Sequence, residues 1–312
     1  MLGNLTDLAA DLGYRTGWAA VRFAPEALAR GVFDAVGTIA GRRGGGPEQL
    51  RRNLSRVIGT TPEEVPTELL EEAMRSYARY WREAFRLPTT NVAEIVASLE
   101  ISDHDRQMID DLSTSDQGLV IALPHSGNWD TCGVWLASQY GQFSTVAERL
   151  KPESLFNQFV EYRESLGFEV FPLTGGEQPP MALLADRLRA GGTICLMADR
   201  DLSHNGVPVT LFGERTRFPA GPAKLAIQTG SPLLAAHHSY TGEKTSLLRC
   251  GTLIDTSGGV EAATQLLADS FAENIAKAPA DWHMLQPLWE SDWSQERRDR
   301  LAEPRAGEAD PA

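Results

Sequence analysis

The stretch Gly118-Leu119-Val120-Ile121-Ala122-Leu123-Pro124-His125-Ser126-Gly127-Asn128-Trp129-Asp130 combines an apolar run, a turn and the start of a helix. The run from Gly118 to Leu123 predicts a buried strand, and Pro124 with Gly127 predicts the turn that ends it. Functional side chains of open α/β sheets collect at the carboxyl ends of strands, where His125 falls. A histidine there can accept a proton near neutral pH, and a nearby carboxylate can fix its tautomer. The stretch therefore predicts acid–base chemistry at a strand end.

The chain on either side repeats strands and helices. Further strands are predicted near residues 143–148, 168–172, 193–198, 233–239 and 246–254, and helices near 128–139, 153–166, 179–190, 219–229 and 260–277. Earlier helices are predicted over 3–37, with an interruption near Pro25, and over 48–58 and 65–85. This alternation predicts an α/β fold with a largely parallel central sheet flanked by helices on both faces, and with an N-terminal helical extension.

Composition limits the class of protein. The chain has 312 residues, of which 42% are hydrophobic and 23% charged, enough for a large core. Its three cysteines, Cys132, Cys195 and Cys250, are widely spaced and odd in number. They predict reduced thiols in a cytosolic protein, neither disulfides nor metal ligands. We expect no membrane-spanning helix and no signal peptide, because the apolar runs are too short and the first residues lack an early cationic region.

Charge is distributed unevenly. Residues 1–60 hold eight arginines and five acidic residues, a net charge of +3, whereas the whole chain carries −13. The same segment has apolar residues at roughly helical spacing: Leu5, Leu8, Leu12, Trp18, Val21 and Phe23. Such a helix can rest on an anionic membrane surface, or it can pack its apolar face on the core. The strongly acidic remainder argues against nucleic acid as a partner.

Five blocks of sequence carry a resemblance to a known family. They are Leu123–Asp130, Ala147–Pro152, Met197–Leu202, Phe218–Ala223 and Trp282–Trp289. In this order they resemble the bacterial lauroyl (lipid A) acyltransferase family, over the chain from about Leu54 to Trp293. Within that family they look most like the actinobacterial phosphatidylinositol mannoside acyltransferases.

The resemblance implies that His125 is the catalytic histidine and that a carboxylate of the third block is its partner. Those enzymes are expected to carry a glutamate where this chain has Asp199, so Asp130, Asp199 and Asp201 all stay open as partners. We predict His125, Asp130 and Asp199 as catalytic residues. The predicted substrate-binding residues are Glu148, Arg163, Arg200 and Asp201. Backbone amides around Ser126 to Asn128, or Arg163, are candidate donors to the oxyanion.

The implied activity is transfer of a fatty acyl chain from acyl-CoA to a sugar hydroxyl of a membrane glycolipid, a mannose of phosphatidylinositol mannosides, with histidine as general base. Acyl-CoA is a co-substrate, and no cofactor or metal is expected. We expect a peripheral protein at the cytoplasmic face of the inner membrane. Its parts would be a basic membrane-association segment (1–60), an α/β acyltransferase domain (61–293) and a disordered tail (294–312).

Other interpretations stay open. The acceptor could be a lipid A-like lipid or a lysophospholipid, or the protein could be a thioester or ester hydrolase, or a lipid-binding protein without catalysis. No Gly-x-Ser-x-Gly motif is present, and Ser126 directly after His125 is poorly placed for a serine–histidine pair. His125 could also be a turn residue, with Asp130 favoured only by the helix dipole. Glu148 and Arg163 could form a structural ion pair. The pairs His237-His238 and Trp282/Trp289 are interpreted as packing residues.

Overall fold

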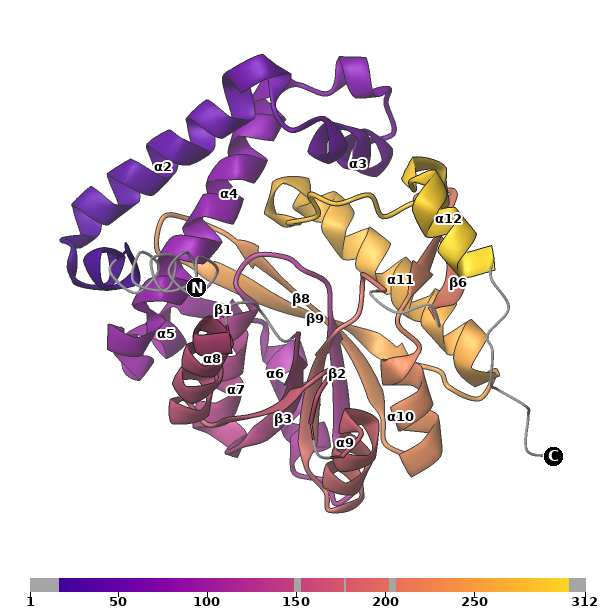
Figure 1. Cartoon of the computed structure of the whole chain (residues 1–312). Coiled ribbons are helices and arrows are strands. Elements are labelled where there is room, and N and C mark those ends of the chain that lie inside the picture. The colour runs from indigo at the N-terminus through magenta and orange to yellow at the C-terminus, as the bar shows by residue number, and fades with distance from the viewer. Residues whose placement is uncertain (1–16, 149–152, 177, 202–205, 303–312) are drawn as a thin grey trace, which may run out of the picture.

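The computed structural model describes residues 17–148, 153–176, 178–201 and 206–302 (Figure 1). A seven-stranded sheet in the order β1-β9-β8-β2-β5-β3-β4 forms the centre. Its strands are β1 (Leu99–Ile101), β2 (Leu119–Leu123), β3 (Phe143–Ala147), β4 (Phe168–Pro172), β5 (Thr193–Met197), β8 (Leu233–Tyr240) and β9 (Ser246–Ile254). The run β8-β2-β5-β3-β4 is parallel, and β9 joins β8 antiparallel. The predicted α/β fold with a largely parallel sheet is confirmed.

Helices cover both faces of the sheet (Figure 1). Four pack against one face: α5 (Val92–Ser98), α6 (Asp103–Ser113), α7 (Trp129–Tyr140) and α8 (Glu153–Ser165). Three pack against the other: α9 (Pro180–Arg189), α10 (Gly221–Thr229) and α11 (Gly259–Lys277). Strand β2 is buried along its whole length because Val120 and Ala122 face one core and Ile121 and Leu123 the other. Such two-sided burial explains why the strand reads as a continuous apolar run.

The N-terminal helices are α2 (Glu26–Arg42), α3 (Glu48–Ile58) and α4 (Thr67–Arg86). Helix α2 lies along α4, and the contact uses glycines, since a Cβ on Gly37 or Gly41 would come within 3 Å of the α4 backbone. Helix α3 is tied to the C-terminal segment, because the buried Asn53 donates to the carbonyl oxygens of Met284 and Gln286. The helical extension is thus packed on the rest of the chain.

Short 3₁₀ helices connect these elements. They are η1 (Arg43–Gly45), η2 (Pro62–Glu64), η3 (Leu87–Thr89), η4 (Pro279–Asp281) and η5 (Glu290–Asp292). Among the described helices, no segment is both long and apolar enough to cross a membrane. The three cysteines are free, with Cys132 buried and Cys195 and Cys250 half-buried.

Several features differ from the sequence expectation. Between α4 and β2, where no element was predicted, the structure has helices α5 and α6 and the short strand β1. A hairpin of β6 (Val207–Leu211) and β7 (Glu214–Phe218) was not predicted, although its alternating burial and the Phe212-Gly213 turn, both at positive φ, are hairpin signals. Within the expected disordered tail, Gln295–Ala302 form helix α12, which Arg297 anchors by its guanidinium over the Trp293 ring. Residues 303–312 lie outside the described part of the chain.

Candidate active site

Strand register brings the predicted histidine to a carboxylate. Strands β2 and β5 are parallel neighbours, and Leu123 is in register with Met197 at their carboxyl ends. The amide of Ala198 donates to the carbonyl of Leu123 at 2.8 Å, which extends the pairing by one residue. His125 and Asp199 each follow two residues after the paired strand ends, so they meet at the same edge of the sheet.

Asp199 is the carboxylate that contacts the imidazole. Its Oδ1 lies 2.5 Å from His125 Nδ1, and its Oδ2 accepts the backbone N–H of His125 at 2.9 Å. The indole N–H of Trp282 donates to the same Oδ2 at 2.9 Å. Asp199 is fully buried, whereas 27% of the His125 side chain is exposed. Asp199 is therefore the fixed, buried residue of the pair, and His125 is the residue that a ligand can reach.

The charge state of Asp199 follows from these contacts. Burial acts to raise the pKa of this carboxyl, but the electrostatic interaction with the His125 ring and the three N–H donors outweigh it, so the pKa lies below its usual range. The ionised carboxylate favours a proton on Nδ1 of His125. The Nε2 atom is then left with its lone pair and can act as a base toward a ligand.

The loop after His125 is held by its own backbone. Gly127 has φ of +54°, and a Cβ there would lie 2.1 Å from Nδ1 of His238, so only glycine fits. The amide of Ser126 donates to the carbonyl of Pro124, that of Gly127 to the carbonyl of Asp281 and that of Asn128 to His238 Nδ1, each at 2.8 Å. These amides, which the sequence suggested as oxyanion donors, are therefore occupied.

Asp130 lies against Arg163 instead of the histidine. Nε of Arg163 donates to Oδ1 at 3.0 Å and Nη2 to Oδ2 at 3.2 Å, a two-point ion pair between α7 and α8. Asp130 is 2% exposed, and the carboxylate raises the pKa of the Arg163 guanidinium further although burial opposes this. The ion pair suggested for Arg163 thus exists, but its partner is Asp130 and not Glu148.

The other predicted binding residues gather at the ends of β3 and β5. Glu148 directly follows β3 and is mostly exposed, and its Oε2 lies 3.9 Å from Nη2 of Arg200. Asp201 is buried, and its carboxylate accepts the amide of Gly206 at 3.1 Å. The structure therefore places Glu148 and Arg200 near each other, while the Asp201 carboxylate folds back on its own loop.

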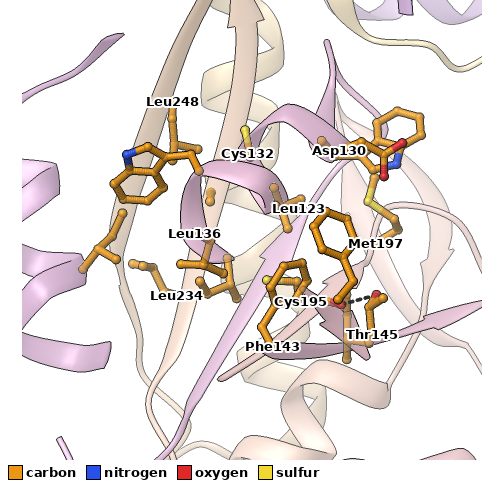
Figure 2. Close-up of a pocket in the computed structure, with 18 of the residues that line it drawn as sticks. Leu123, Asp130, Cys132, Leu136, Phe143, Thr145, Cys195, Met197, Leu234 and Leu248 are labelled. Carbon is orange, nitrogen blue, oxygen red and sulfur yellow. Dashed lines mark hydrogen bonds between the residues drawn. The ribbon is translucent and has the colours of Figure 1, made fainter. Parts of the chain in front are cut away.

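A mostly apolar cavity opens beside this edge, between the sheet and α7 (Figure 2). Figure 2 shows Asp130 and Met197 at one end, and Leu234 and Leu248 at the other. The cavity has a volume of about 90 Å³, which is smaller than a typical small-molecule pocket of roughly 300–1,000 Å³, so a long acyl chain would have to widen it. All three cysteines line it, and burial raises the pKa of each thiol, so they are neutral walls.

The cavity is adjacent to the histidine. Leu123 and Met197, the last residues of β2 and β5, both line it. So does Trp129, whose ring lies edge-on to the His125 imidazole with 5.5 Å between the ring centroids. The Asp130–Arg163 pair is the charged part of the lining. An apolar chain in the cavity would thus have its polar end near the imidazole.

The contribution of the C-terminal block, Trp282–Trp289, to this site was not predicted from the sequence. Trp282 was interpreted as packing, and it does pack against Trp289 with 6.0 Å between ring centroids, but it also donates to Asp199. The amide of His283 donates to the carbonyl of His125 at 2.8 Å. His238, also interpreted as packing, accepts the Asn128 amide. The only signal was a histidine and a tryptophan side by side, which does not reveal a long-range partner.

Metal ligation has no support among the residues that the structure describes, where no three histidine, cysteine, aspartate or glutamate side chains are grouped. His237 and His238 point to opposite faces of β8 because successive strand residues alternate.

The buried histidines around the site predict acid lability. Burial lowers the pKa of His237, His238 and His283 to about 3, from about 6.5 in an unfolded chain. The folded state therefore binds fewer protons, and stability is full above about pH 6.5 and falls as the pH drops toward 3. We expect the free energy of unfolding in urea to fall by about 2 kcal/mol per histidine between pH 7 and pH 5.

The matched variant for this prediction is His237→Leu. Both ring nitrogens of His237 lack a partner among the described residues, so leucine removes a titrating group without breaking a recorded hydrogen bond. We expect this variant to lose about a third less stability than the wild type over the same pH range. Equal pH dependence of the two proteins would contradict the prediction.

A buried carboxylate, an accessible imidazole and an apolar cavity thus lie together at the end of a parallel sheet, an arrangement that is chemically able to carry out acid–base chemistry on a ligand with an apolar chain. The chain matches the family model of bacterial lipid A biosynthesis acyltransferases over residues 8–291, and it belongs to this family. It is an acyltransferase of that family.

Two relatives are similar along nearly their whole length. A phosphatidylinositol mannoside acyltransferase of Mycolicibacterium smegmatis is 57% identical over 291 residues, which cover 93% of this chain and 95% of the relative. A phosphatidylinositol mannoside acyltransferase of Mycobacterium tuberculosis is 52% identical over 298 residues, which cover 96% of this chain and 94% of the relative.

Proposed function

We propose that this protein transfers a fatty acyl chain from acyl-CoA to a mannose hydroxyl of a phosphatidylinositol mannoside, with His125 as general base. The observation that carries the proposal is the His125–Asp199 pair next to the apolar cavity. The names of the two relatives support the acceptor. No cofactor is needed, since the thioester itself is activated.

The chemistry follows from the tautomer of His125. Nε2 removes the proton of the sugar hydroxyl while its oxygen attacks the thioester carbonyl carbon, and the carbonyl oxygen takes up the negative charge. The tetrahedral intermediate then collapses, the carbon–sulfur bond breaks, and the imidazolium returns its proton to the thiolate. Asp199 stabilises the imidazolium between these steps. Positioned acid–base help of this kind supplies about 10²–10⁴-fold in rate.

Arg163 is our candidate for stabilising the oxyanion. Its two bonds to Asp130 use two of the five N–H groups of a guanidinium, and it lines the cavity. The amides of Ser126 to Asn128 have other partners, so this role falls to a side chain. A single such donor is worth about 3 kcal/mol of transition-state stabilisation.

The polar residues Glu148 and Arg200, at the carboxyl ends of β3 and β5, are suited to bind the sugar acceptor. Glu148 and Arg200 follow neighbouring strands, and both are partly exposed. Carboxylate and guanidinium groups at such a position can hydrogen-bond sugar hydroxyls or a phosphate. We assign Glu148 and Arg200 to acceptor binding, while the cavity takes the acyl chain. The buried Asp201 carboxylate, which accepts the Gly206 amide, has a structural role in its loop and does not bind the acceptor directly.

The proposal is tested with purified protein, palmitoyl-CoA or a palmitoyl-carrier protein as donor, and a panel of acceptors: a phosphatidylinositol mannoside, a lipid A precursor and a lysophospholipid. We expect acceptor-dependent thiol release and an ester on a mannose hydroxyl, located by mass spectrometry. Thiol release that does not depend on any acceptor would favour a hydrolase. Product only on another acceptor would overturn the mannoside assignment.

We further propose that the enzyme binds the anionic surface of the cytoplasmic membrane through α2. The large apolar residues of this helix point away from α4: Leu28, Val32, Val36 and Ile39 are between 51% and 60% exposed. Their spacing places them on one helix face. Several arginines of the basic segment are engaged within the protein, among them Arg42 with Glu71 and Arg56 with Asp292. The exposed apolar face of α2, formed by Leu28, Val32, Val36 and Ile39, is therefore the main support for membrane binding.

Vesicle binding tests whether the apolar face of α2 contacts the membrane. Val32→Gln/Val36→Gln is expected to weaken binding to vesicles containing anionic lipid by about 30-fold, because each half-exposed valine contributes about 1 kcal/mol on burial. The control is Leu253→Gln/Leu266→Gln, which changes two similarly exposed leucines on β9 and α11. Co-sedimentation measures both. The proposal fails if the two double variants bind alike.

A further inference from the structure

The C-terminal block runs alongside the histidine loop. Ser126 and Trp282 form an antiparallel bridge, flanked by the bonds from Gly127 N–H to the Asp281 carbonyl and from His283 N–H to the His125 carbonyl. This pairing fixes where the Trp282 backbone lies relative to His125. The Trp282 side chain, 1% exposed, then donates its indole N–H to Asp199 inside the protein.

The block is itself held in place. The Asp281 carboxylate accepts the Ser76 hydroxyl and the Tyr240 amide, both at 2.7 Å. The carbonyl of Met284 accepts the Asn53 side chain, also at 2.7 Å. Anchors from α4, β8 and α3 thus leave the indole little freedom to follow a moving carboxylate.

Two donors meet at one oxygen of Asp199. Oδ2 accepts both the His125 amide and the Trp282 indole N–H at 2.9 Å, while Oδ1 faces His125 Nδ1. The His125 amide belongs to the same loop as the imidazole, so Trp282 is the donor that ties the carboxylate to a separate part of the fold. With Oδ2 held on two sides, the carboxylate plane is set and Oδ1 is aimed at the imidazole.

We propose that Trp282 is a positioning residue for acyl transfer: its indole N–H sets the orientation of Asp199 and thereby the geometry of His125. This inference rests on the proposed function. Trp282 is not among the residues that line the cavity and reaches the imidazole through Asp199, so its effect should fall on kcat and leave KM for both substrates within about twofold. Loss of a hydrogen bond to a charged group predicts a decrease in kcat of about 10–100-fold.

The chain offers a matched control. Trp289 is fully buried, packs against Trp282 and donates its indole N–H to the Leu211 carbonyl at 3.0 Å, away from Asp199. Trp282→Phe and Trp289→Phe each remove one buried indole hydrogen bond and the same volume. We expect comparable losses in thermal stability, with the decrease in kcat confined to Trp282→Phe.

A second substitution separates the hydrogen bond from packing and serves if Trp282→Phe fails to fold. Benzothienylalanine at position 282 keeps the bicyclic shape and replaces the N–H by sulfur, so it should reproduce the loss of kcat. In the wild type, proton NMR should show a strongly downfield Nδ1–H resonance of His125, absent in His125→Ala and shifted when the indole donor is lost.

The outcomes keep the two proposals apart. If the wild type transfers acyl groups and both phenylalanine variants have the same kcat, or the benzothienyl variant is fully active, the positioning role is wrong. If the wild type releases no thiol to any acceptor, the proposed function is wrong, whatever the variants do.

Discussion

His125→Ala is expected to lower kcat for acyl transfer by about 10²–10⁴-fold, because no other group takes the hydroxyl proton at this strand end. The fold should survive, since the loop is held by backbone bonds and 27% of the side chain is exposed. Asp199 keeps two of its three donors, the His125 amide and the Trp282 indole. Transfer from palmitoyl-CoA, measured beside the circular dichroism spectrum, checks both statements.

The control for this variant is His104→Ala, which removes an exposed histidine at the start of α6 and should leave kcat within twofold. Activity of His125→Ala within tenfold of the wild type would exclude general-base catalysis by this residue. It would then favour a lipid-binding role, or catalysis by a different base.

Asp199→Asn is expected to lower kcat by about 10³–10⁴-fold while keeping the side-chain shape. The two donors at Oδ2, the His125 amide and the Trp282 indole, require an acceptor there, so the amide oxygen of asparagine takes that place. Its NH₂ group then faces Nδ1 of His125. This geometry forces the proton onto Nε2, and the imidazole loses the lone pair that accepts the substrate proton.

Two comparisons make this prediction sharp. Asp199→Glu restores a carboxylate and should retain more activity than the asparagine variant, although the added methylene costs packing. Asp110→Asn is the control. It changes an aspartate that accepts the Tyr140 hydroxyl and does not contact the His125–Asp199 pair, so the variant should keep full activity. Nitrogen NMR of His125 reports the tautomer. A wild-type tautomer together with wild-type kcat in Asp199→Asn would contradict the mechanism.

Local sequence was sufficient for the strand, the turn and the candidate histidine. The run from Gly118 to Leu123 is apolar because β2 is buried on both faces, and that property belongs to the run itself. The position of His125 after the strand follows from Pro124 and Gly127. The sequence also identified Asp199, Glu148 and Arg200 as strand-end residues, since each follows an apolar or β-branched run.

The partners of these residues could not be predicted from the sequence around each of them. Asp130, Asp199 and Asp201 were all possible partners of His125, and the choice depended on the neighbour of β2 and on its register. Because Leu123 is paired with Met197, Asp199 reaches the imidazole. Asp130, in the first turn of α7, is turned toward Arg163 on α8. When two strands are far apart in sequence, neither segment by itself contains a signal that predicts their contact.

The sequence alone thus established an α/β chain with a histidine at a strand end and acidic residues at others, because burial and turn formation are properties of a few consecutive residues. The three-dimensional arrangement selected Asp199, assigned the Ser126 to Asn128 amides to other partners, and brought Trp282 to the carboxylate. It also turned the apolar side of α2 outward, since glycines contact α4. Each of these depends on which elements become neighbours, and strand register and helix packing settle that only in the folded chain.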